Sequence, residues 1–174
     1  MKKTMMAVAL GLSALSIQSA LAAEYSEKTQ YLGVVNGQVV GNSVVKVTRI
    51  PADPVLYRSG SNSPLPAELI IRHAESRPAS GGLANITVKQ ALPDNGEARI
   101  TLKTALMADG KRVALSARQQ GEDVVITVPE AQKLVELRTD VPAELELPAG
   151  YRGEVRIRLT VEDYSSDRQQ ERDA

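Results

Sequence analysis

Apolar and polar residues alternate with a period of two along most of this chain. The clearest example is the set of apolar residues at every second position near the C-terminus: Val155, Ile157, Leu159 and Val161. Successive side chains of a β-strand point to opposite faces of the sheet, so this pattern predicts a strand with one buried face. The spacing that is typical of amphipathic helices is almost absent. The sequence therefore predicts an all-β fold.

Turn signals separate the predicted strands at intervals of about 8–12 residues. Asp109-Gly110 follows the alternating segment 98–106 and predicts a two-residue hairpin. Asn36-Gly37, which lies between two valine pairs, predicts another hairpin near the N-terminus. Short strands with such regular turns are typical of an antiparallel sandwich, and we expect an immunoglobulin-like β-sandwich.

The composition limits the chemistry that the chain can carry out. Its 174 residues are one domain's worth of sequence, and its 21 basic and 21 acidic side chains give no excess of positive charge for binding nucleic acid. The chain contains no cysteine, which excludes disulfides, zinc–cysteine sites, iron–sulfur clusters and thiol nucleophiles. Packing alone must therefore stabilise the fold.

The two ends of the chain differ from the rest. Lys2 and Lys3 precede an apolar run from Met5 to Ile17, and Ala20-Leu21-Ala22 follows as a small-x-small cleavage signal. The run is shorter than the roughly 18 residues that a membrane-spanning helix needs, so residues 1–22 are interpreted as a secretory signal peptide. The last ten residues, 165–174, are polar and are expected to form a disordered tail. We expect an exported protein.

His73 is the only histidine of the chain and a candidate for catalysis. Ser76, Glu68 and Glu75 lie near it in sequence, but no serine occupies the strand-turn-helix elbow of a nucleophile motif. His73 and Glu75 would supply two metal ligands, whereas a structural zinc site needs about four. We therefore expect a solvent-facing His73 at a strand end, and we predict neither an enzyme, a cofactor nor a metal site.

Two segments carry a resemblance to a known family. The run Ala67–Ile71 and the closing segment Pro148–Val161, in which a glycine-rich turn around Tyr151 leads into the alternating final strand, resemble subunits of chaperone–usher fimbriae. Together with the signal peptide and the length, they make the chain most similar to a minor subunit of thin, adhesive fimbriae. The resemblance implies a sandwich that lacks its last strand. A hydrophobic groove would then lie open beside the final strand, with one wall formed by Val155, Ile157, Leu159 and Val161.

The resemblance also implies partners. A periplasmic chaperone would fill the groove first, and the N-terminal extension of a neighbouring subunit would replace it at the outer-membrane usher. Residues 23–36 would be such an extension and residues 37–164 the pilin-like sandwich. The candidate donor positions are Tyr25, Thr29, Tyr31, Gly33 and Val35. Glu27 falls in the same register, where burial of its carboxylate would be costly. Function would then be structural, in a fimbrium at the cell surface, with a host receptor as a further candidate partner.

An alternative remains open at this point. A complete periplasmic β-sandwich would need no strand from another protein and would act as a self-contained binding module. Its ligand would then contact the loops Ser59–Pro66 and Ser76–Gly82, which are rich in Gly, Ser and Pro.

Overall fold

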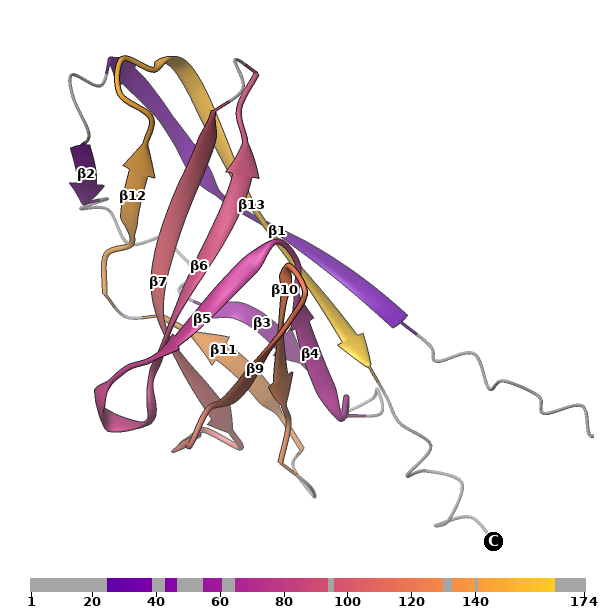
Figure 1. Ribbon diagram of the computed structural model, residues 1–174. Coiled ribbons are helices and arrows are strands. Elements are labelled where there is room, and N and C mark those ends of the chain that lie inside the picture. Colours follow the sequence, from indigo (N-terminus) through magenta and orange to yellow (C-terminus); the bar gives the residue numbers. More distant parts are fainter. Residues whose placement is uncertain are drawn as a thin grey trace, which may run out of the picture.

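The computed structural model describes residues 25–38, 43–46, 55–60, 65–93, 96–129, 133–139 and 141–164. The predicted signal peptide and the predicted polar tail lie outside these ranges. The described chain is nearly all antiparallel β-strand, arranged as two packed sheets (Figure 1). The predicted all-β antiparallel sandwich is confirmed.

The first sheet has the strand order β1-β13-β4-β10-β9. Its strands, in that order, are β1 (Tyr25–Gln38), β13 (Arg152–Tyr164), β4 (Glu68–Ile71), β10 (Asp123–Thr127) and β9 (Ser116–Gln120). The N-terminal and C-terminal strands thus pair with each other, and they run side by side through the molecule (Figure 1). The resemblance implies an open edge beside the final strand. In this structure the chain's own β1 lies there.

The second sheet is built around the long strand β7 (Glu97–Ala108). The main order is β2 (Ser43–Lys46), β12 (Glu144–Leu147), β7, β11 (Val135–Arg138) and β3 (Val55–Ser59). Three further strands extend it, with β6 (Ala84–Ala91) and β8 (Lys111–Val113) pairing with β7 and β5 (Ala74–Pro78) pairing with β6. A short 3₁₀ turn, η1 (Ser80–Gly82), joins β5 to β6.

The core lies between the two sheets and is aliphatic. The largest fully buried side chains come from both layers: Leu69, Ile71, Val124, Ile126, Val155, Leu159 and Val161 from the first, and Ile86, Leu106, Val135, Leu137 and Leu145 from the second. At about 25 cal/mol per Å² of apolar surface removed from water, such burial is the main source of stability in a fold without disulfides. In the described ranges no helix is both long and apolar enough to cross a membrane.

One predicted hairpin is confirmed and another is wrong. Asp109 and Gly110 have φ of 48° and 76° and form the two-residue turn between β7 and β8. Asn36-Gly37 forms no hairpin, because β1 continues to Gln38 and crosses the predicted domain boundary at residue 36. Gly37 pairs instead with Gly153, so pairing with β13 overrides the local turn preference. The expected loop Ser76–Gly82 is also partly wrong, since its first residues belong to β5.

Candidate functional site

β13 presents the predicted groove residues to the core. Val155, Ile157, Leu159 and Val161 are 1%, 3%, 0% and 0% exposed. Arg156 and Arg158, which alternate with them, are exposed. The strand and its buried face are therefore as the alternation predicts. That these four residues line a groove for another protein's strand stays a prediction, because here they pack within their own chain.

β13 depends on β1 for most of its strand pairing. β1 pairs antiparallel with it from Tyr25 opposite Tyr164 to Gln38 opposite Arg152. On the other side, β4 pairs only with residues 161–164. Among the described residues, β1 is thus the only strand that pairs with residues 152–160 of β13. Backbone N–H and C=O groups need partners, so this stretch requires an occupant at its β1 edge.

A register shift divides the candidate donor positions. It falls between Tyr31 and Gly33, where β1 carries one extra residue. Three of the positions, Tyr25, Thr29 and Tyr31, pair with Tyr164, Thr160 and Arg158, whereas Gly33 and Val35 pair with Ile157 and Val155. Glu27 pairs with Glu162 and is exposed, which avoids the cost of burying its carboxylate. This pairing lies within one chain, and the expected exchange between subunits stays a prediction.

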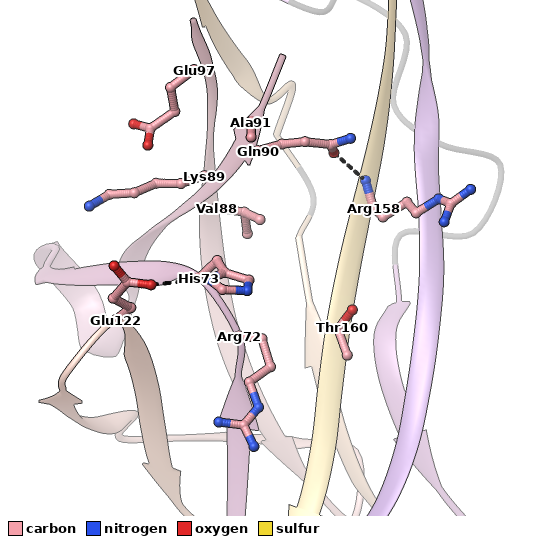
Figure 2. Close-up of a pocket in the computed structure, with 10 residues that line it drawn as sticks. All are labelled: Arg72, His73, Val88, Lys89, Gln90, Ala91, Glu97, Glu122, Arg158 and Thr160. Carbon is pink, nitrogen blue, oxygen red and sulfur yellow. Dashed lines mark hydrogen bonds and ion pairs between the residues drawn. The ribbon is translucent and has the colours of Figure 1, made fainter. Parts of the chain in front are cut away.

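A pocket of about 390 Å³ lies on the side of β13 away from β1, against β6 and the turn between β4 and β5 (Figure 2). Gln90 on β6 reaches across it, and its Oε1 accepts a hydrogen bond of 3.1 Å from the backbone N–H of Arg158. The Gln90 side chain therefore satisfies a backbone group of β13 on the edge that faces away from β1. His73 lines the same pocket with φ of 48° and a side chain that is 69% exposed. The expected solvent-facing His73 is confirmed, and its Nδ1 lies 3.4 Å from a carboxylate oxygen of Glu122.

Arg72 fixes the other end of β13 to the neighbouring strands. Its Nε and Nη2 donate hydrogen bonds of 2.8 and 2.6 Å to the two carboxylate oxygens of Glu162 on β13. Its Nη1 is paired with Asp123 at the start of β10. Both carboxylates stabilise the guanidinium and raise the pKa of Arg72, with the hydrogen bonds to Glu162 as the largest cause. β13 is therefore held to β4 and β10 only near its C-terminal end.

A second polar contact joins β13 to the other sheet. The Tyr57 hydroxyl on β3 donates a hydrogen bond of 2.8 Å to Asp163 Oδ2. Tyr57 is only 3% exposed, and burial, together with the carboxylate of Asp163, raises the pKa of its phenol. From β1, the ammonium of Lys28 lies 4.7 Å from the centroid of the Tyr57 ring. β1, β3 and β13 thus meet at one small polar cluster.

Comparison with known proteins adds to this geometry. The model of a family of unknown function, DUF5462, matches residues 7–163. The chain belongs to this family. The K88 minor fimbrial subunit FaeF of Escherichia coli is 88% identical to it over 163 residues, which are 94% of this chain and 100% of that protein. The predicted resemblance to a minor fimbrial subunit is confirmed. No solved structure matches the chain.

The sequence did not predict the polar cluster of Lys28, Tyr57 and Asp163. Neither Tyr57 nor Asp163 stands out in sequence, since they lie 106 positions apart and only the fold brings them together. Lys28 does carry a signal, because it is the only basic residue within residues 25–38. Elsewhere in the described ranges, no three His, Asp or Glu side chains gather closely enough to hold a metal ion.

Proposed function

We propose that this chain is a structural, non-enzymatic subunit of an adhesive fimbria and that it assembles by donor-strand exchange. One observation carries the proposal: residues 152–160 of β13 have β1 as their only described strand partner, and β1 is the N-terminal strand at the edge of its sheet. A strand in that position can be replaced from outside without disturbing the order of the other strands.

Strand exchange should change the free energy little, because the contacts that β1 gives up are replaced by those of the incoming strand. An incoming strand that pairs with β13 in the same register forms the same ladder of backbone hydrogen bonds that β1 gives up. It also covers the same edge of the aliphatic core, to which Leu159 and Val161 contribute fully buried side chains. The net cost is then mainly that of opening the edge, so a partner that binds during opening can drive the exchange.

The proposal includes the partners and the location that the resemblance implies. A periplasmic chaperone would occupy the β13 edge after export through the signal peptide, and the outer-membrane usher would be the place of exchange. The N-terminal strand of a neighbouring fimbrial subunit would then replace the chaperone, and Tyr25, Thr29, Tyr31, Gly33 and Val35 are the donor positions of this chain. The relative FaeF supports this assignment through its description as a minor fimbrial subunit. Contact with a host receptor would be the adhesive role.

A cross-linking experiment tests the exchange. A peptide of residues 25–38 with Thr29→Cys is incubated with the exported chain carrying Thr160→Cys, since Thr29 and Thr160 pair directly. The native chain has no cysteine that would compete. We expect a mixed disulfide between peptide and chain. A chain with Glu154→Cys, which pairs with Asn36, is the matched control and should form little adduct.

The opposite result is equally clear. If the chain stays a monomer that unfolds cooperatively and takes up no peptide in any register, donor-strand exchange is wrong. The pairing of β1 within the chain would then favour the second candidate function, a self-contained periplasmic binding module. Its ligand site would be sought at the loop Ser59–Pro66 and at the turn between β5 and β6.

A further inference from the structure

Lys28, Tyr57 and Asp163 form a polar cluster at the edge of the aliphatic core. It lies where β1 and β13 of the first sheet meet β3, which is the edge strand of the second sheet's main order. Elsewhere along β13 the residues that face the core are aliphatic. Lys28 pairs with Val161, and directly opposed residues of an antiparallel pair share one face of the sheet.

Lys28 makes two contacts with β3. Its Nζ donates a hydrogen bond of 3.2 Å to the backbone carbonyl of Arg58, and its ammonium lies 4.7 Å from the centroid of the Tyr57 ring. The Arg58 guanidinium does not compete with it, because Arg58 Nε pairs at 2.8 Å with Glu136. A cation over an aromatic face is attracted by the ring, and the flexible lysine stem lets the charged end stay near water. One exposed side chain therefore ties β1 to the opposite sheet.

Asp163 makes this end of β13 attractive to a cation. Its Oδ2 accepts the hydrogen bond from Tyr57, whereas its Oδ1 is buried and has no hydrogen-bond partner among the described residues. A buried carboxylate oxygen without a partner is costly, and a nearby positive charge reduces that cost. Tyr57 connects the two charges, since its ring contacts Lys28 and its hydroxyl contacts Asp163.

Only the observed register of β1 places a positive charge opposite Val161, where it lies over the Tyr57 ring. Within residues 25–38 Lys28 is the only basic residue, so any slip of β1 moves the charge away from this position. A slip of one residue would bring either Glu27 or Thr29 opposite Val161, and Glu27 would place a second carboxylate near Asp163. A slip of two residues that brings Ser26 there moves Lys28 opposite Leu159 and away from Asp163, whereas the slip that brings Gln30 there moves Lys28 opposite Asp163 and off the Tyr57 ring. A single charged position can thus select one register, as buried polar residues do in coiled coils.

We propose that Lys28 sets the register of β1 and that Tyr57 and Asp163 form the site that receives its charge. The occupant that this site fits is an N-terminal strand with Lys or Arg opposite Val161, namely the β1 strand of a second copy of this chain. The part that concerns a second copy rests on the proposed function. The part that concerns register holds within one chain and is tested there first.

The first test measures register within one chain. Two double variants report it by disulfide formation: Thr29→Cys with Thr160→Cys joins residues that pair, and Thr29→Cys with Arg158→Cys joins them only after a two-residue slip. We expect the in-register disulfide to dominate in the parent chain. Lys28→Met should lower the ratio of in-register to slipped disulfide roughly tenfold, and Asp163→Asn should lower it in the same direction. Lys28→Arg should restore the ratio.

The matched control is Glu27→Gln, which removes a charge from the neighbouring exposed position of β1 and should leave the ratio unchanged. Because Lys28 is exposed, Lys28→Met should fold, and the far-ultraviolet circular dichroism of the variant checks this. An unchanged ratio in folded Lys28→Met would overturn the proposal. A ratio that falls equally with Glu27→Gln would also overturn it, since any charge on β1 would then have the same effect.

The second test measures selection of an incoming strand. Peptides of residues 25–38 with Thr29→Cys and either Lys28, Arg or Met at position 28 compete for the chain with Thr160→Cys. We expect the Lys28 and Arg peptides to form adduct roughly tenfold faster than the Met peptide. Equal uptake of all three would overturn selection while leaving donor-strand exchange intact. If no peptide is taken up but register still depends on Lys28, the proposed function and its selection step fail, and the register role of Lys28 stands.

Discussion

β7 and β13 are two long strands that both contribute fully buried side chains to the aliphatic core, but their strand pairing differs. Leu106 on β7 and Leu159 on β13 are both 0% exposed. β7 pairs with four strands, β6, β8, β11 and β12, and its partners β6 and β8 are its neighbours in sequence. β13 pairs along its length with β1, from the far end of the chain, and with four residues of β4.

The difference shows that burial and strand pairing are separate properties of a β-strand. The partners of β7 are tied to it through short connections such as the Asp109-Gly110 turn, so they re-form readily after any local opening. The main partner of β13 is joined to it only through the whole intervening sandwich. We therefore expect β1 to leave more readily than the partners of β7, as the proposed exchange at the β13 edge requires.

The largest expected effect tests the burial of core side chains, which β7 and β13 share. Leu159→Asp and Leu106→Asp each place an unpaired charge in a desolvated site, at a cost of several kcal/mol, which is comparable with a domain's whole stability of about 5–15 kcal/mol. Both variants should disappear from the periplasm by proteolysis, as measured by immunoblot. Arg158→Asp, on the exposed face of β13, should change the free energy of unfolding by only about 0.5 kcal/mol and should accumulate. Equal tolerance of Leu159→Asp and Arg158→Asp would show that the face assignment of β13 is wrong.

The next effect tests strand pairing, in which β7 and β13 differ. If β1 exchanges as proposed, its opening exposes the backbone of residues 152–160 without unfolding the sandwich, whereas we expect exposure of β7 to require global unfolding. Hydrogen exchange of backbone amides should therefore give an opening free energy for this part of β13 that is about 2 kcal/mol or more below that of β7. Equal opening free energies for the two strands would mean that β1 leaves only when the whole domain unfolds.

A smaller effect tests the contact between β13 and β3. Because burial raises the pKa of Tyr57, the unfolded chain loses this proton first as the pH rises past about 10. The stabilisation is fully present below that pH and is lost as the pH rises toward the raised value, with a slope of up to about 1.4 kcal/mol per pH unit. Urea unfolding at pH 9 and pH 11 should show a loss of about 1 kcal/mol more in the parent chain than in Tyr57→Phe. Equal losses would place the Tyr57 hydroxyl outside the buried contact with Asp163.

The sequence predicted most of the fold because strands are encoded locally. The alternation in 155–161 predicted β13 and its buried face, and Asp109-Gly110 predicted the hairpin between β7 and β8. Asn36-Gly37 misled the prediction for the same local reason. Its turn preference is weaker than the ladder that β1 forms with β13, and that ladder depends on residues more than a hundred positions away.

The candidate site was predictable only in part. The apolar face of β13 follows from period-two alternation, but the β1 register does not, because the bulge between Tyr31 and Gly33 breaks that period. The contacts of Arg72 with Glu162 and of Tyr57 with Asp163 join distant segments, and nothing local in the sequence marks them. Charged residues at such positions are usually interpreted as solvated, and only the fold shows which ones meet.

The central claim is that β1 must leave β13 for the subunit to assemble, and a pair of disulfide locks tests it most directly. Thr29→Cys with Thr160→Cys locks β1 to β13, because opposed residues of an antiparallel pair have Cα separations that a disulfide can span. Thr87→Cys with Thr101→Cys locks β6 to β7 at a pair whose hydroxyls are 2.9 Å apart, and it is the matched control. Both variants should fold and reach the periplasm. Fimbriae purified from cells that make each variant should contain the β6–β7 lock at the parent level and almost none of the β1–β13 lock, which its single-cysteine variants should restore. Equal incorporation of the two locked chains would contradict the account.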